Sequence, residues 1–264
     1  MIVDYHMHLR APDESIDHSV EAVERFVDVA AARGIDEIGF AEHVYYFEVT
    51  CSLWSAPYHL ERCRYPIEPY VEAVVDAKRQ GMPVKLGLEV DYVPGREEAT
   101  KEILAPFPWD FLIGSIHFIG DEGIDGEPSL VERVGVEQAW RRYYDTLTSA
   151  AGSGLFDTLA HPDLVKMYGE EIPWDWATVA GSLDGVCLEV SSAGLHKRHG
   201  KLYPNPDLLA EAKEEGVPIT LASDAHIPQN VGRDLERAIE HARAAGFETV
   251  TVFEHRQARQ EPLG

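Results

Sequence analysis

Seven times along the chain, a short apolar run is followed by a longer stretch with helical spacing of its apolar residues. Short apolar runs bounded by turn residues predict buried strands. Repeated strand and helix signals predict βα units around a parallel sheet. The runs are Ile2–Tyr5, Glu37–Ala41, Val84–Leu88, Phe111–Ile113, Thr158–Ala160, Val186–Val190 and Ile219–Ala222, with a last strand-like segment at Thr249–Phe253.

The stretches between the runs predict helices at 19–33, 68–80, 96–104, 138–150, 174–180, 206–215 and 235–245. Ser19 suits the N-cap of the first helix, and Gly34 ends it. Seven strands, each followed by a helix, predict an α/β fold of the closed or nearly closed barrel type. An open doubly wound sheet is the alternative, but its nucleotide-binding form loses support because the chain has no GxGxxG or GxxxxGK[ST] loop.

Length and charge narrow the class of protein further. A chain of 264 residues suits one α/β barrel domain, which we expect to span residues 1–264. The formal net charge of −23 disfavours nucleic acid polymers and anionic membranes as partners. No run approaches the roughly 20 apolar residues of a membrane helix, and the first residues do not resemble a signal peptide. Three cysteines without a CxxC pair suit a reducing compartment, so we expect a cytoplasmic protein.

Histidine, glutamate and aspartate cluster just past the predicted strands. In a parallel barrel, the carboxyl ends of the strands share one face, where active sites are built. Alternation along a strand makes His6 and His8 point the same way, and Asp224 and His226 repeat that spacing. The side chains at these ends are His6, His8, Glu42, His43, Glu89, His117, His161, Asp224 and His226.

The number of these side chains predicts more than one metal ion. Six histidines with Glu89 and Asp224 exceed what a single four-coordinate metal uses. Carboxylates can bridge two ions, so two or three divalent metals sharing ligands are expected. Imidazole suits zinc and iron, and carboxylate suits manganese, so zinc, iron and manganese all stay open.

The segments that carry these residues also resemble a known family. DYHMH, GFAEH, GLEVDYVPG, DFLIGSIHF, LAHPDLVK, EVSSAGL, LYP and ASDAH occur in the order typical of the polymerase and histidinol phosphatase (PHP) superfamily. The match is closest to its monofunctional histidinol-phosphatase branch and covers nearly the whole chain. The resemblance implies a distorted (β/α)7 barrel that holds three metals.

Carried over position by position, the resemblance implies three sets of metal ligands. His6, His8, Glu89 and Asp224 would hold the first metal, Glu89 would bridge to a second held by His117 and His161, and His43 and His226 would hold the third. Many relatives have a further histidine shortly after the first pair. Here Glu14 stands near that spacing and His18 lies slightly beyond, and either is a candidate ligand.

The phosphate-binding residues follow the family pattern less closely. Relatives typically have an arginine after AGL, where this chain has His196, so Lys197 and Arg198 are the candidate substitutes. Lys166, five residues past His161, is a further candidate.

The loop 44–67 is longer than a usual βα connection, which is typical of a functional loop. It carries aromatic residues together with Arg62 and Arg64, which would suit a substrate with an imidazole ring and a phosphate. Cys51 and Cys63 in this loop are expected to be free thiols.

The resemblance implies a phosphoric monoester hydrolase that converts L-histidinol phosphate to L-histidinol in histidine biosynthesis. Paired cations can activate water and neutralise phosphoryl charge, so no side-chain nucleophile is needed. Glu89 would bridge metals, and Asp224 or His226 would assist proton transfer. Two alternatives stay open: a related phosphoesterase for nucleotides or another small phosphate ester, and a metal-binding module without catalysis.

Overall fold

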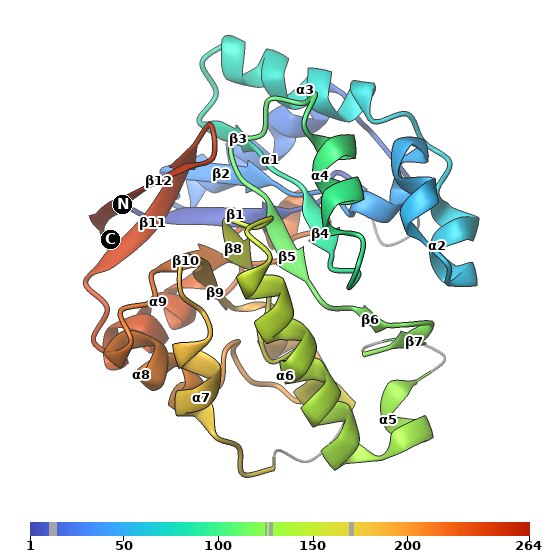
Figure 1. Cartoon of the computed structure of the whole chain (residues 1–264). Coiled ribbons are helices and arrows are strands. Elements are labelled where there is room, and N and C mark those ends of the chain that lie inside the picture. The colour runs from blue at the N-terminus through green and yellow to red at the C-terminus, as the bar shows by residue number, and fades with distance from the viewer. Residues whose placement is uncertain (11–14, 125, 127–128, 169–171) are drawn as a thin grey trace.

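The strands of the chain form two parallel sheets that join into a closed, distorted barrel (Figure 1). The structure is a computed structural model, and it describes residues 1–10, 15–124, 126, 129–168 and 172–264. One sheet has the order β1-β2-β3 and the other the order β10-β9-β8-β5-β4. The barrel strands are β1 (Val3–Met7), β2 (Glu37–Phe40), β3 (Val84–Leu86), β4 (Glu89–Asp91), β5 (Ile113–Ser115), β8 (Thr158–Leu159), β9 (Cys187–Ser191) and β10 (Ile219–Ala222).

Two seams close the ring of strands. At one seam, the backbone N–H of His8 donates to the carbonyl of Ala225 (2.8 Å), which joins β1 to the segment after β10. At the other, the N–H of Glu89 donates to the carbonyl of Glu42 (3.0 Å), which joins β4 to the segment after β2. Strands β3 and β4 occupy one position in the ring, so the described residues give seven positions. The predicted (β/α)7 barrel is confirmed.

Helices follow the strands and cover the outside of the ring (Figure 1). The first begins as the sequence predicts, since the Ser19 side chain accepts a hydrogen bond from the N–H of Ala22. Short helices α2 (Pro57–Arg62) and α5 (Leu130–Val134) were not predicted. The predicted helices are observed as α1 (Val20–Ala32), α3 (Glu68–Arg79), α4 (Glu97–Leu104), α6 (Val136–Gly152), α7 (Trp176–Gly181), α8 (Pro206–Glu214) and α9 (Leu235–Ala244).

The chain ends in a hairpin at the end of the barrel opposite to the predicted metal ligands. Strand β11 (Thr249–Glu254) matches the last predicted strand, but its antiparallel partner β12 (Gln257–Pro262) was not predicted. The remaining short pair is β6 (Phe118–Ile119) and β7 (Glu122–Gly123). No described helix has the length and apolar character needed to cross a membrane.

The two cysteines of the loop 44–67 are joined in a disulfide, so the prediction of free thiols was wrong. The loop doubles back on itself, because the N–H of Glu48 donates to the carbonyl of Tyr65 (2.9 Å). This pairing brings the Cα atoms of Cys51 and Cys63 to 5.7 Å. The third cysteine, Cys187, is buried and free. Because this disulfide pairs two of the three cysteines, the cysteine content no longer supports a reducing compartment.

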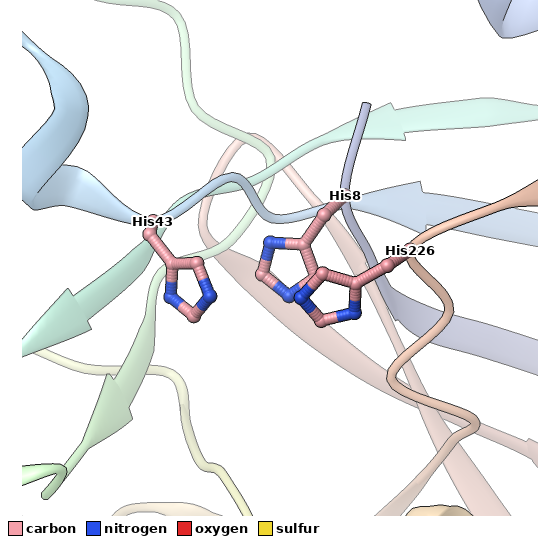
Figure 2. Close-up of side chains that lie close together, drawn as sticks. All are labelled: His8, His43 and His226. Atoms are coloured by element: carbon pink, nitrogen blue, oxygen red, sulfur yellow. The ribbon is translucent and has the colours of Figure 1, made fainter. Parts of the chain in front are cut away.

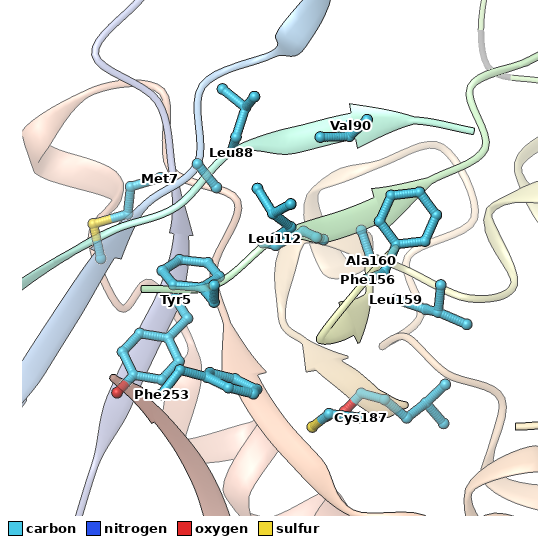
Figure 3. Close-up of a cluster of buried hydrophobic side chains, with 14 of the residues drawn as sticks. Tyr5, Met7, Leu88, Val90, Leu112, Phe156, Leu159, Ala160, Cys187 and Phe253 are labelled. Atoms are coloured by element: carbon cyan, nitrogen blue, oxygen red, sulfur yellow. The ribbon is translucent and has the colours of Figure 1, made fainter. Parts of the chain in front are cut away.

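Three aromatic rings fill the interior of the barrel below the histidines. The rings of Tyr5 and Phe111 lie 5.3 Å apart between centroids, and Phe253 of the hairpin lies 5.8 Å from Tyr5 (Figure 3). Two glycines make room for Phe111. A Cβ atom built on Gly39 would lie 2.7 Å from the Phe111 ring, and one on Gly87 would lie 2.3 Å from it.

We therefore predict that Gly87→Ala destabilises the barrel by about 1–3 kcal/mol, the usual range for an overpacked core. The matched control is Gly152→Ala at the end of α6, where a Cβ atom meets nothing within 4 Å. The control should leave the free energy of unfolding nearly unchanged or raise it slightly. Urea unfolding of both variants measures the difference, and equal midpoints for both would contradict the close fit around Phe111.

Candidate metal centre

A buried glutamate lies at the centre of the cluster that the sequence predicts. Glu89 begins β4 and has no exposed surface. His6 reaches it from β1 and His8 from just after β1, with their Nε2 atoms 3.4 Å and 3.8 Å from Oε2 of Glu89. Nδ1 of His43 lies 2.6 Å from the same oxygen. Three predicted ligands from two different strand ends therefore meet one carboxylate oxygen.

The other carboxylate oxygen of Glu89 faces two more histidines. Nε2 of His161 lies 3.2 Å from Oε1, and Nε2 of His117 lies 3.4 Å from it. His117 follows β5 and His161 follows β8, so each reaches the centre from its own strand end. Five imidazoles thus surround one carboxylate.

Asp224 and His226 complete the cluster on the side of His8. Oδ1 of Asp224 lies 3.4 Å from Nε2 of His8 and 3.6 Å from Nδ1 of His226. The ring of His8 stacks between His226 and His43, with centroid distances of 4.2 Å and 4.3 Å (Figure 2). The structure therefore gathers all eight core predicted ligands in one place.

The local backbone is unusual at two of these residues. Asp224 has φ +53° and His161 has φ +26°, and side chains other than glycine rarely adopt positive φ. Such conformations persist where surrounding contacts hold them, and they gather at functional sites. At these two positions, the backbone turns the side chain toward the centre.

Three groups of the cluster have pKa values that suit metal binding, whereas burial lowers and neighbouring carboxylates more strongly raise the pKa values of His6 and His8. Burial opposes ionisation of Glu89, but the neighbouring imidazoles of His117 and His43 hold its pKa well below the usual range. Burial likewise opposes ionisation of Asp224, but the contact with the His8 ring and the nearby His226 hold its pKa well below the usual range. Burial lowers the pKa of His226 to about 3, and His8 adds to the effect. The carboxylates are thus ionised and the His226 ring is neutral near pH 7, as metal ligands must be.

Unpaired atoms test whether the cluster fits cations. Buried polar atoms normally have a hydrogen-bond partner. Among the described residues, five atoms of the cluster lack a partner in hydrogen-bonding geometry, namely Nε2 of His6, Nε2 of His8, Nδ1 of His43, Oε2 of Glu89 and Nδ1 of His161. Three sets of cluster residues each offer ligand atoms that lie within 4.8 Å of one another inside the set. The sets are His8 with His43 and His226, His6 with His8 and Glu89, and His43 with Glu89 and His117. The donor set therefore fits divalent cations.

Three further carboxylates hold the outer nitrogens of the histidines. Such second-layer hydrogen bonds fix the ring orientation and tautomer of metal-binding histidines. Nδ1 of His8 donates to Glu42 (3.3 Å), Nδ1 of His6 donates to Glu189 (2.7 Å), and Nδ1 of His117 donates to Asp91 (3.0 Å).

Sequence reasoning noted Glu42 at a strand end, but it gave no role to Asp91 or Glu189. Two signals were available. Asp91 stands two residues after Glu89 and so shares its side of the strand, and Glu189 is the single charged residue of an otherwise apolar run.

Of the two candidates for an additional ligand, His18 is not part of the cluster's centre. Nε2 of His18 lies 3.9 Å from Oε2 of Glu42, so His18 stands behind that second-layer carboxylate. Its ring packs near Tyr70, at 5.4 Å between centroids. Glu14 lies outside the described residues.

A cavity of about 460 Å³ opens over the cluster. Glu89, His117, Asp224 and His226 form part of its wall, and Tyr45, Tyr46, Tyr58 and Phe118 form an aromatic part. Its positively charged lining comprises Arg10, Lys197 and Arg233, with His196 beside them. Sequence reasoning singled out His196 and Lys197 but missed Arg10 and Arg233.

Four other residues that the sequence predicts to contact the phosphate do not line this cavity. Lys166 is fully buried, and its Nζ donates to Asp163 (2.8 Å) and to the carbonyl of Leu202 (2.6 Å), so it serves an internal ion pair. The guanidinium of Arg62 stacks on the ring of Tyr58 at 3.8 Å.

The last two of these contacts, Arg64 and Arg198, are exposed, and Arg64 donates to the carbonyl of Glu61. All four side chains lie outside the cavity because nearer partners hold them or because they point into solvent.

Comparison with known proteins places this site in a family. The PHP domain model matches residues 4–193. A probable histidinol-phosphatase of Deinococcus radiodurans is 34% identical over 260 residues, covering 95% of this chain and 96% of the relative. A histidinol-phosphatase of Lactococcus lactis subsp. lactis is 26% identical over 268 residues, covering 95% and 94%.

Solved structures share the fold. A histidinol phosphate phosphatase from Lactococcus lactis subsp. lactis, complexed with zinc, L-histidinol and phosphate, has a TM-score of 0.78 at 22% identity and covers 98% of both chains. A putative histidinol phosphatase from Listeria monocytogenes has a TM-score of 0.75 at 22% identity and covers 89% of this chain and 99% of the other. The family model and the long match to the Deinococcus relative together show that this chain belongs to the PHP domain family.

Proposed function

We propose that this chain is a metal-dependent phosphomonoesterase that hydrolyses L-histidinol phosphate to L-histidinol and inorganic phosphate. The observation that carries the proposal is the cluster of six histidines, Glu89 and Asp224 under a cavity with a cationic wall. Relatives matched over nearly their whole length are named histidinol-phosphatases. A chain of the same fold holds zinc, L-histidinol and phosphate.

The proposed metal content is three divalent cations per chain, chosen from zinc, iron and manganese. His6, His8, Glu89 and Asp224 would hold one. Glu89 would be shared with a second, held also by His117 and His161, and His43 and His226 would hold the third. When bound, these cations supply Lewis-acid chemistry: they lower the pKa of bound water and neutralise phosphoryl charge.

The side chains of the cavity wall have the remaining tasks. We assign the phosphate group to Arg10, Lys197 and Arg233, because charge-assisted hydrogen bonds are the strong ones for phosphate oxygens. The guanidinium of Arg10 is held 4.1 Å over the ring of Tyr46. Asp224 and His226 border the same cavity and are the proposed partners for proton transfer to the leaving alcohol.

The aromatic side chains of the cavity are the proposed contacts for the ring of the substrate. The side chains of Tyr45, Tyr58 and Phe118 also line the cavity, and the guanidinium of Arg62 stacks on the ring of Tyr58. Aromatic rings bind a planar heterocycle by stacking or edge contacts, so an imidazole ring suits this wall. The pairing of an aromatic wall with a cationic wall fits a small molecule that carries a ring and a phosphate.

The remaining assignments follow from charge and length. We propose that residues 1–264 act as one catalytic domain and that the partner is a small phosphorylated molecule. A nucleic acid polymer would meet a chain with a net charge of −23, which opposes its approach. A cytoplasmic location stays a prediction.

The substrate assignment predicts a preference that steady-state kinetics can measure. With zinc or manganese added, kcat/KM for histidinol phosphate should exceed the values for mononucleotides and p-nitrophenyl phosphate by at least about tenfold, since a misfit of even one methylene group in a pocket costs about 1–3 kcal/mol. A higher value for mononucleotides would indicate the alternative phosphoesterase. No turnover of any ester by metal-loaded protein would indicate a module without catalysis.

The metal assignment predicts that Glu89→Ala removes metal and activity together while the fold survives. Glu89 contacts five imidazoles, so its loss should lower kcat/KM by more than about 100-fold, the upper range for a second-layer change. Metal content by mass spectrometry and helix content by circular dichroism give the two readouts. The matched control is Glu24→Ala on the exposed face of α1, which should behave as wild type. Full activity in metal-free Glu89→Ala protein would reject the mechanism.

The cationic wall predicts a separate effect on substrate binding. Arg233→Ala should lower kcat/KM for histidinol phosphate by about 10–100-fold, the loss expected for a charge-assisted hydrogen bond of about 1.5–3 kcal/mol. It should also raise the inhibition constant of inorganic phosphate. Arg64→Ala, a surface arginine away from the cavity, serves as the control. Equal kinetics for the two variants would exclude Arg233 from the phosphate contacts.

A further inference from the structure

Glu189 is a buried carboxylate that the proposed mechanism leaves without a task. It lies in β9 between the apolar residues Leu188 and Val190, and it has no exposed surface. A buried carboxylate is costly unless charged or hydrogen-bonding groups satisfy it. The groups that satisfy Glu189 therefore show why it is there.

Both oxygens of Glu189 bind predicted metal ligands. Oε2 accepts a hydrogen bond from Nδ1 of His6 (2.7 Å), and Oε1 accepts one from the backbone N–H of His161 (3.1 Å). His161 follows the neighbouring strand β8, whereas His6 belongs to β1 and is 183 residues away in sequence. One carboxylate thus joins two ligands that come from distant parts of the chain.

Glu189 supports an unfavourable backbone conformation at His161. His161 has φ +26°, a conformation that needs support from its surroundings. Glu189 binds its N–H, and the hydroxyl of Tyr143 donates to its carbonyl (3.2 Å). Both polar groups of this residue's backbone are therefore fixed, and the ring is presented to Glu89 with Nε2 at 3.2 Å.

The contact with His6 sets which ring nitrogen faces the cluster. A proton on Nδ1 that is shared with Glu189 leaves the lone pair on Nε2. That atom lies 3.4 Å from Oε2 of Glu89 and has no hydrogen-bond partner among the described residues. The other tautomer would place a proton where a cation must bind.

We propose that Glu189 is a positioning residue that fixes the His6 ring and the His161 backbone together, and so controls the occupancy of two of the metal positions. The inference rests on the proposed function only for the assignment of His6 and His161 to different metals. Asp91 offers a contrast, because the structure gives its carboxylate one ligand ring, that of His117.

The isosteric variant Glu189→Gln tests the proposal in the full chain. Glutamine offers one acceptor oxygen and one donor NH₂ group, so it can satisfy His6 or the N–H of His161 but not both. Metal-free protein is titrated with Zn²⁺ by calorimetry, and the metal retained against buffered free Zn²⁺ is measured by mass spectrometry. We expect the apparent affinity to fall about 10–100-fold at two positions. In the control variant Asp91→Asn, we expect the same loss at one position.

A second variant keeps the result decisive if Glu189→Gln does not fold, and a double variant adds a check if it does. Glu189→Asp keeps the charge but is one methylene shorter, so it should also lose affinity at one or both positions. In a His6→Ala background, the effect of Glu189→Gln should shrink, because one of its two partners is already gone.

Wild-type stoichiometry and affinity in a folded Glu189→Gln protein would overturn the proposal, as would a loss of thermal stability with unchanged metal binding. These readouts do not involve turnover. A wild-type chain that binds zinc but fails to hydrolyse histidinol phosphate would contradict the proposed function and leave the role of Glu189 to be decided by the titration.

Discussion

The carboxylate of Glu89 among five imidazoles is the interaction on which the site depends. Glu89 begins β4 at the seam where the two sheets meet, so the backbone contact that closes the barrel also places this carboxylate in the cluster. Five buried polar atoms of the cluster, on His6, His8, His43, Glu89 and His161, lack a partner in hydrogen-bonding geometry among the described residues. An arrangement of this kind is costly as hydrophobic core and favourable around cations. The barrel therefore carries a centre whose stability and activity should both follow its metal content.

The surroundings of Glu89 show how the fold keeps its ligands in place. Glu42, Asp91 and Glu189 each hold the outer nitrogen of one histidine, and each comes from or just after a different barrel strand. Glu42 and Glu189 also bind backbone N–H groups at His43 and His161, which ties ring orientation to strand position. Rigid elements thus set the geometry, while the cavity wall above them consists of loop side chains that can vary with the substrate.

The sequence was sufficient for the barrel and for the convergence of the predicted ligands, because both depend on period and position. Apolar runs followed by polar strand ends predicted the strands and the convergence of residues as distant as His6 and His226. The hairpin strand β12 was not predicted because its residues are mostly exposed and polar. Its turn also gives no sequence signal, since His255 and Arg256 take the positive φ positions where Asn-Gly is usual. Lys166 was misjudged because sequence distance from His161 does not reveal that Asp163 holds it internally. The cavity cations Arg10 and Arg233 depend on how loops fold over the barrel, which no local pattern encodes.

Anomalous X-ray diffraction from crystals of zinc-loaded protein, measured at the zinc edge, tests the central claim most directly. The account predicts anomalous peaks about 2.0–2.2 Å from the histidine nitrogens and from Glu89, with that carboxylate shared between two of them. Peaks that lie only at the acidic group of Asp110, Glu254 and His255 at the other end of the barrel would contradict it. So would zinc-loaded crystals in which Glu89 contacts no metal.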